Sequence, residues 1–291
     1  MCHWNDDNPF ASFGLERPTV PLDDEENEDE DIEDAAESTP SLYDVELLGS
    51  WLRFPFNRTC LLGTRGDTFF FSSGKKHFEY SRADVNQLSK RRTGGSIFRC
   101  RMQQLRIRFS LIFTITVQLT AMLDGNTTLR VAKLIAWSKT SSDDEMEPII
   151  RKAITELAWN WIPLFAWIPL AISLGFSLSV FANHGLLAAL GPLHGASLVF
   201  IGFVVAMLWP NTRWAATLPT GCLACAVDYL VRSFFAQNAD ETVSYRMFAG
   251  IMLFFAGICY APVHTDAEAQ RAFARELKAA ETAEPTTKSS D

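Results

Sequence analysis

The chain has 291 residues, a mean hydropathy of +0.04 and a formal net charge of −8 at pH 7. These averages hide regions of opposite character, because residues 1–50 carry sixteen acidic residues and one basic residue, whereas residues 51–110 carry thirteen basic and three acidic residues. The sequence contains no Walker loop, dinucleotide fingerprint, HExxH or nucleophile elbow. The absence of these motifs is weak evidence against catalysis and leaves a membrane enzyme as an alternative.

The acidic segment 1–41 is predicted to be a disordered tail. From Asp23 to Asp34 the chain is almost unbroken acid with few aromatic residues. Such a segment buries too little apolar surface to offset the entropy lost on ordering. The first residues also lack the basic start and apolar core of a signal peptide. The first spanning helix is therefore expected to act as the internal insertion signal.

A basic, β-rich soluble domain is predicted over residues 42–140. From Leu105 to Ala121 apolar residues occupy every odd position and polar residues fill most even ones. This alternation is typical of a half-buried strand, or of two strands joined at a bend. A fifth spanning helix is the alternative, and the strict alternation disfavours it. The phase slips at Gln103 and Gln104, which predicts a bulge or a turn.

Further short strands are expected on both sides of this segment. Asp124-Gly125 is a tight-turn signal, so a hairpin is predicted there, with its second strand over Leu129–Trp137. Runs at 58–62, 67–72 and 76–80 complete five or six antiparallel strands. This order is compatible with a small barrel or a roll such as the pleckstrin-homology type, although no motif identifies a family.

Four long apolar stretches follow, at about 158–181, 185–209, 214–235 and 243–262. About 20 apolar residues span the hydrocarbon core of a bilayer, and backbone groups in lipid must be satisfied within the segment. The stretches therefore predict a four-helix transmembrane bundle in an α+β, multi-pass membrane protein. A polar joint and an interfacial amphipathic helix are expected over 141–157, and a short helix with a disordered tail over 263–291.

Basic residues flanking the spans predict their orientation. Arg151, Arg213 and Arg271 lie near one end of the bundle, whereas Arg232 and Arg246 are the basic residues at the other. The positive-inside rule then places both termini in the cytoplasm. An aromatic belt is expected on the cytoplasmic side, formed by Trp159, Trp161, Trp209, Trp214 and Tyr260.

Asp228 is the most informative polar residue within the predicted spans. A carboxylate in hydrocarbon is costly and is by default a candidate functional group. Arg232 lies four residues later on the same helical face and can neutralise it. A structural ion pair is the favoured interpretation, and an intramembrane site for a proton, ion or substrate is the alternative.

Other polar and small residues of the spans are interpreted as packing features. Cys222 and Cys225 form a CxxC, but no second ligand pair or electropositive surrounding accompanies it, so packing is favoured over dithiol or metal chemistry. His184 and His194 are expected to be solvated rather than ligands. Small residues four apart predict close helix packing, at Ser173 and Ser177, at Gly191 and Gly195, and at Gly221 and Cys225.

The favoured function is a non-enzymatic, membrane-anchored scaffold or accessory subunit, whose cytosolic basic β-domain binds anionic lipid or a protein partner. The candidate contacts are Lys75, Lys76, Lys90, Arg91, Arg92, Arg99, Arg101, Arg106 and Arg108. The alternatives are a small transporter or channel-like bundle that uses Asp228, and a membrane enzyme. No catalytic residue, metal or cofactor is predicted. The expected partners are membrane lipids and other membrane proteins, not nucleic acid.

Overall fold

A computed structural model describes residues 41–53, 56–91, 97–101, 103–109, 114–120 and 124–283. Within these ranges it leaves aside the side chains of 53, 56–57, 91, 180–181 and 183–194. The predicted acidic tail, apart from its last residue, and the predicted C-terminal tail from residue 284 lie outside the described residues.

The soluble part is built on one antiparallel sheet of seven strands in the order β4-β3-β2-β1-β7-β6-β5. Every neighbouring pair except β1 and β7 is consecutive in the chain, so the sheet grows by hairpins and then joins its first strand to its last. The described residues therefore contain more strands than the five or six predicted. The strands are β1 (Val45–Arg53), β2 (Phe56–Arg65), β3 (Thr68–Ser73), β4 (Lys76–Ser81), β5 (Phe98–Arg101), β6 (Gln104–Arg108) and β7 (Thr114–Leu119).

The alternating segment after residue 104 forms two of these strands, which was one of the two predicted alternatives for it. β6 and β7 pair antiparallel, with Leu105 opposite Val117 and Ile107 opposite Ile115. All four side chains are fully buried, so the period of two places one face of the hairpin in the core. The predicted break at Gln103 is confirmed as the turn between β5 and β6.

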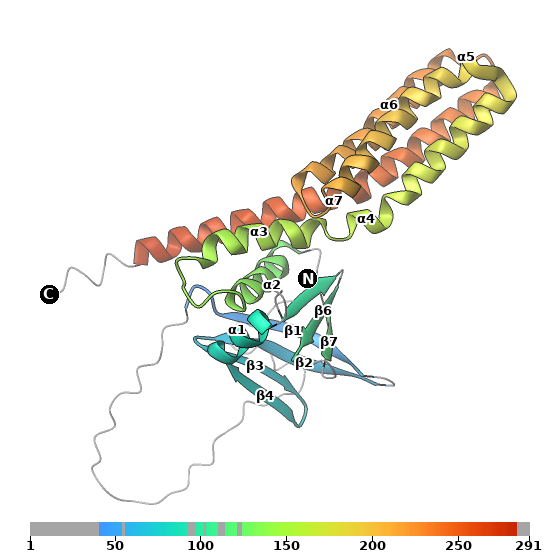
Figure 1. The fold of residues 1–291 in the computed structure, drawn as a ribbon. Helices are drawn as coiled ribbons and strands as arrows, with labels where there is room; N and C mark the ends of the chain where they lie inside the picture. The colour runs from blue at the N-terminus through green and yellow to red at the C-terminus, as the bar shows by residue number, and fades with distance from the viewer. Residues whose placement is uncertain are drawn as a thin grey trace, which may run out of the picture. The chain divides into compact units, whose positions relative to one another are not determined.

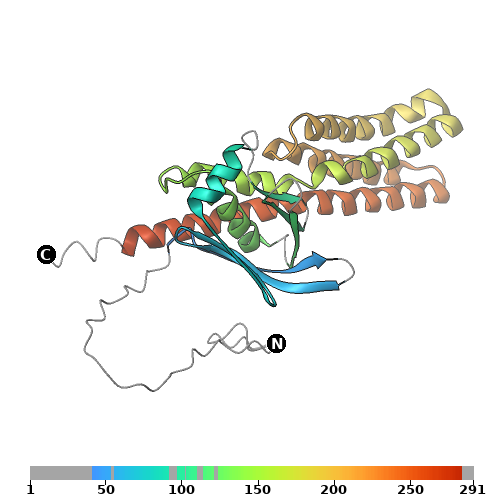
Figure 2. The same ribbon diagram turned by 60° about the horizontal axis from the view of Figure 1, so that its bottom comes forward.

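The strand predicted over Leu129–Trp137 is wrong, because Gly125–Trp137 form helix α2. Leu129, Leu134 and Trp137 are all buried, as are most residues between them. A run that is apolar on every side carries no clear period, so pattern alone could not separate a buried helix from a strand. α2 lies between the sheet and the helices that follow (Figures 1 and 2). Helix α1 (Arg82–Arg91), between β4 and β5, was not predicted.

Gly125 serves packing rather than a hairpin turn. A Cβ at this position would lie 2.6 Å from Glu268 Cγ and 2.9 Å from the backbone nitrogen of Ala269. The backbone N–H of Gly125 also donates a hydrogen bond to Glu268 Oε2 at 3.2 Å. The glycine therefore lets the start of α2 approach a helix more than 140 residues later in the chain.

Helix α3 (Met146–Trp159) contains the predicted amphipathic helix. Its apolar side chains, among them Met146, Ile150 and Ile154, are fully buried against the soluble domain. Arg151 and Lys152 are exposed on the other side. Protein thus covers the apolar face that was predicted to lie in the bilayer interface.

Three helical segments are long and apolar enough to cross a membrane: 146–179, 213–235 and 239–282. The first contains α3, α4 (Ile162–Phe165) and the start of α5 (Trp167–Leu208). The second contains the 3₁₀ turn η2 (Arg213–Ala216) and α6 (Thr217–Phe235), and the third lies within α7 (Ala239–Ala283). The predicted second span falls in the last part of α5. The apolar helix described there, Gly195–Leu208, is shorter than the three segments that are long enough to cross a membrane. Three of the four predicted spans are therefore confirmed as capable of crossing.

Helix α5 turns back on itself. The rings of Trp167 and Phe203 lie with their centroids 4.4 Å apart, although 36 residues separate them. A straight helix rising 1.5 Å per residue would place them about 54 Å apart. Figure 1 shows the reversal near the α5 label. The two halves of α5 are therefore antiparallel neighbours.

The buried apolar residues form two clusters, and α7 contributes to both. The soluble core contains the inner sheet face, α2, α3, and Ala269 and Phe273 of α7. The bundle core contains residues of α4 to α6 together with Met252 and Cys259 of α7. The short C-terminal helix predicted after residue 262 is thus continuous with the last span, through Pro262. Its predicted apolar pair, Phe273 and Leu277, packs on the soluble core.

We expect Phe273→Ala to destabilise the soluble domain by about 3–5 kcal/mol, because it leaves a cavity at a fully buried site. The measurement is denaturant unfolding of the detergent-solubilised full chain, followed by hydrogen exchange of β3 and β7. Arg275→Ala, two residues along on the exposed side of α7, is the matched control. Equal protection of the strands in both variants would show that α7 does not belong to this core.

Candidate functional site

Four exposed arginines lie on the outer side of the β5–β6 hairpin, which we call the arginine face: Arg99, Arg101, Arg106 and Arg108. The alternation that buries Phe98, Leu105 and Ile107 turns the arginines outward. Register places Arg99 directly opposite Arg106. None of the four forms an ion pair with another described residue, so their positive charges repel one another and favour an anionic ligand.

The other predicted basic contacts lie elsewhere. Lys75 is in the β3–β4 turn, and Lys76 begins β4 with its ammonium 5.2 Å from the centre of the Trp51 ring. Lys90 and Arg91 end α1. β4 and β5 are opposite edges of the sheet. The structure therefore brings together four of the nine predicted residues, and Arg92 lies outside the described residues.

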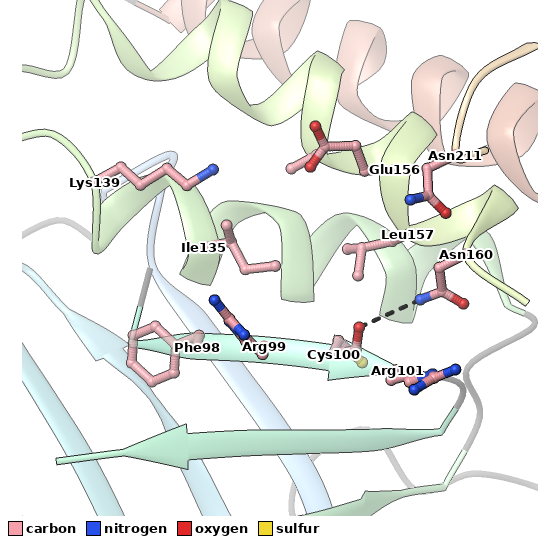
Figure 3. Close-up of a pocket in the computed structure, with 11 residues that line it drawn as sticks. Phe98, Arg99, Cys100, Arg101, Ile135, Lys139, Glu156, Leu157, Asn160 and Asn211 are labelled. Atoms are coloured by element: carbon pink, nitrogen blue, oxygen red, sulfur yellow. Dashed lines mark hydrogen bonds between the residues drawn. The ribbon is translucent and has the colours of Figure 1, made fainter. Parts of the chain in front are cut away.

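A cavity of about 450 Å³ opens beside β5 (Figure 3). β5, the end of α2, α3 and the loop between α5 and η2 form its walls. Its apolar lining consists of Phe98, Ile135, Ala153 and Leu157, together with the partly buried Cys100. Its polar lining consists of Arg99, Arg101, Lys139, Glu156, Asn160 and Asn211. An apolar floor with few convergent polar groups is the usual form of a ligand site.

Asn160, the C-cap residue of α3, holds the edge strand β5 against the start of the bundle. Its Nδ2 donates a hydrogen bond to the carbonyl oxygen of Cys100 at 3.4 Å. Its Oδ1 is covered by protein and has no hydrogen-bond partner among the described residues. A buried acceptor without a donor is costly. Asn160 therefore positions β5 at the cavity, and its covered oxygen is not a contact offered to a ligand.

Asn211 brings the loop after α5 to the cavity. Its φ of 63° is in the left-handed region, which asparagine tolerates better than most residues. Two exposed tryptophans flank it, Trp209 at 51% and Trp214 at 68% exposure. Tyr260 is also exposed, so three residues of the predicted aromatic belt present their rings to the surroundings.

Two residues of the predicted belt do not fit it. Trp159 is only 1% exposed and belongs to the bundle core. Trp161 is partly buried, with its ring 5.4 Å from that of Phe165. Trp159 is the last residue of α3 and Trp161 follows shortly after it, where other helices cover the chain. Aromatic content near a span could not distinguish a ring that meets lipid from a ring that packs in the protein.

Asp266 fastens three elements beside the cavity. Its Oδ2 accepts a hydrogen bond from Arg213 Nε at 3.0 Å, and its Oδ1 accepts one from Thr155 Oγ1 at 3.1 Å. The Asp266 side chain is 6% exposed. Charged hydrogen bonds of this kind stabilise a buried carboxylate. Asp266 was missed by sequence reasoning, and its signal was an acidic residue placed just beyond an apolar span.

Asp228 and Arg232 form the predicted pair on α6. Arg232 Nε donates a hydrogen bond to Asp228 Oδ2 at 3.1 Å, four residues along the helix. Both side chains are about one-third exposed at the helix surface. This is the geometry of the structural interpretation. A role of Asp228 in transport stays a prediction.

No described cysteine forms a disulfide with another described residue. Cys222, Cys225 and Cys259 are buried in the bundle core. In the soluble domain, burial raises the pKa of Cys60 and of Cys100 to about 12, which disfavours the reactive thiolate. Among the described residues no group of three or more His, Cys, Asp or Glu could hold a metal ion. The side chains of His184 and His194 lie outside the described residues.

Small residues do pack α5 against α6 as predicted. A Cβ at Gly195 would lie 2.8 Å from Cys225 Sγ, and one at Gly221 would lie 2.5 Å from the carbonyl oxygen of Leu198. Gly202, which was not predicted, makes an equally close approach to Leu218. Gly191 lies among the residues whose side chains are not described.

No family model, curated protein or solved structure matches the chain. No residue can therefore be given a role by comparison with a similar protein. The features that point to a function are physical: an arginine face without ion pairs to other described residues, a cavity with basic and amide groups in its lining, and two exposed tryptophans close in the chain to Asn211 of that lining.

We expect Asp228→Asn and Arg232→Gln each to destabilise the bundle more than the double variant does. Each single change leaves one charge in a low-dielectric setting without its partner, at a cost on the order of 1–3 kcal/mol. A double-mutant cycle by thermal unfolding in detergent measures the coupling. Additive effects of the two single changes would exclude a structural pair.

Proposed function

We propose that the protein is a non-enzymatic, membrane-anchored binding module whose basic β-domain binds anionic lipid at the surface of its own membrane. The observation that carries the proposal is the position of β5. This strand carries half of the arginine face and is hydrogen-bonded through Cys100 to Asn160, where the chain enters the bundle. The arginines are thus presented close to the helices that reach into the bilayer.

We propose a topology of four crossings, and a parity argument supports it. The chain leaves the soluble domain through α3 and returns to it through α7, whose Phe273 lies in the soluble core. An even number of crossings is required for both ends to lie on one side. Because α5 reverses, its two halves, α6 and α7 supply four. The basic residues Arg151, Arg213 and Arg271 then lie on the side of the soluble domain, which the positive-inside rule assigns to the cytoplasm.

The energetics favour lipid because the domain is already held at the surface. Each well-placed arginine near anionic lipid contributes about 1 kcal/mol of binding free energy. Four arginines would therefore raise the binding constant for anionic over neutral lipid by at most about a thousandfold. This attraction fades beyond about 10 Å at 0.1 M salt. Attachment of β5 to α3 provides that proximity without a separate binding step.

The topology predicts the labelling of engineered thiols in sealed, right-side-out vesicles. A cysteine introduced into the N-terminal segment and another introduced after α7 should both stay unreactive toward an impermeant maleimide until the membrane is permeabilised. The variants are made in a background without native cysteines. Labelling of either position in intact vesicles would overturn the assignment of both ends to the cytoplasm.

Lipid binding predicts that anionic bilayers protect the β5–β6 hairpin. We expect slower amide hydrogen exchange in β5 and β6 when the full chain is in nanodiscs of phosphatidylcholine with phosphatidylserine than in phosphatidylcholine alone, and the difference should shrink at high salt. Arg106→Gln with Arg108→Gln should remove most of it.

The matched control is Arg275→Gln with Lys278→Gln, which removes the same charge from the exposed end of α7. It should leave the protection in place. Equal exchange in neutral and anionic nanodiscs would refute lipid binding by the arginine face and would favour a protein partner. The full chain is required, because residues of α3 and α7 complete the soluble core.

A further inference from the structure

We propose that the cavity beside β5 binds one phosphorylated polyol headgroup of a membrane lipid, in an inference that rests on the proposed function and names its ligand. The cationic groups Arg99, Arg101 and Lys139 would hold phosphate. Glu156 would accept hydrogen bonds from hydroxyl groups. The arginine face senses the charge of the bilayer, whereas the cavity selects one lipid.

The cavity has room for a ligand larger than a simple anion. Its volume is about 450 Å³, whereas a water molecule in the liquid takes about 30 Å³. A lone phosphate would leave most of this space to water. A six-membered polyol with phosphate attached has the bulk to fill it. The apolar floor, which includes Phe98 and Leu157, suits the C–H faces of such a ring.

The cationic groups lie toward different ends of the cavity. In Figure 3, Lys139 and Arg99 lie toward one end, and Arg101 lies toward the other, beside Asn160. Two residues along a strand separate Arg99 from Arg101 by about 6.6 Å. Positive charge at separated places fits a headgroup with phosphate at separate positions, such as the diester to the lipid and a second, monoester phosphate.

An exposed acceptor in the same cavity favours hydroxyl donors. Glu156 is exposed and lies 3.9 Å from Lys152, too far for a strong hydrogen bond. A phosphate ligand without hydroxyl groups would be repelled by Glu156. A polyol donates hydrogen bonds to Glu156 while its phosphates meet the cations.

The loop that contributes Asn211 supports a membrane ligand. Along the chain Asn211 lies between the exposed Trp209 and Trp214, and exposed tryptophans mark the headgroup level of a bilayer. The diester phosphate would lie near Arg101 and Asn211, with the acyl chains left in the bilayer. The second phosphate would reach inward to Arg99 and Lys139.

The test titrates the detergent-solubilised full chain with dioctanoyl lipids and counts bound molecules by native mass spectrometry. We expect one molecule of phosphatidylinositol 4-phosphate to bind more tightly than phosphatidylinositol, phosphatidic acid or phosphatidylserine. Arg99→Gln and Lys139→Gln should each lower the affinity for phosphatidylinositol 4-phosphate about tenfold and change the affinity for phosphatidylinositol little. Arg101→Gln should lower the affinity for both inositol lipids. Glu156→Gln should reduce the preference for the inositol lipids over phosphatidic acid.

Lys278→Gln is the matched control, because it removes one positive charge from the exposed end of α7, outside both the arginine face and the cavity. It should leave inositol-lipid affinity unchanged, and all variants should share the parent melting temperature. Weak binding of every anionic lipid, unaffected by the cavity variants, would overturn this inference and leave the proposed function standing. Equally tight binding of soluble inositol 1,4-bisphosphate would overturn the assignment to a lipid. Selective binding of one inositol lipid without hairpin protection in phosphatidylserine nanodiscs would support the cavity and refute the arginine face.

Discussion

One helix belongs to two hydrophobic cores, and the arrangement of the protein depends on that constraint. α7 packs Met252 and Cys259 into the bundle core and Ala269 and Phe273 into the soluble core, without a break at Pro262. A continuous helix transmits orientation, because its backbone hydrogen bonds resist bending. The soluble domain is therefore not a separate module on a flexible linker. Its sheet shares a core with a helix that also packs in the apolar bundle.

Polar contacts at the junction explain why the two cores stay in register. Asp266 binds Arg213 and Thr155, and the buried Lys133 donates a hydrogen bond to the carbonyl oxygen of Leu42 while pairing with Glu276. Buried charges contribute little net stability when they are paired, but loss of one partner costs several kcal/mol. Such groups favour one arrangement of helices over its alternatives, which apolar surfaces alone do poorly.

The candidate site follows from this rigid junction. The edge strand β5 meets the end of α3 at Asn160, and the loop carrying Asn211 reaches the same cavity from the bundle. Charge acts over about 10 Å at 0.1 M salt, so the effect of an arginine depends on where the fold holds it. Lys75 and Lys76, at the opposite edge of the sheet, have the same charge as the arginines of β5 but a different neighbourhood.

The sequence by itself determined those features that depend on short-range pattern. Apolar length identified the helices able to cross a membrane, a period of two identified β6 and β7, and a spacing of four identified the pair of Asp228 and Arg232. Only the tertiary structure decided that Gly125–Trp137 is a helix, that Trp159 is buried, and that Asn160 and Asn211 line one cavity with Arg99. The reason is physical: these outcomes depend on which distant surface covers each residue, and Gly125 meets Glu268 across the fold. Local periodicity carries no information about that partner.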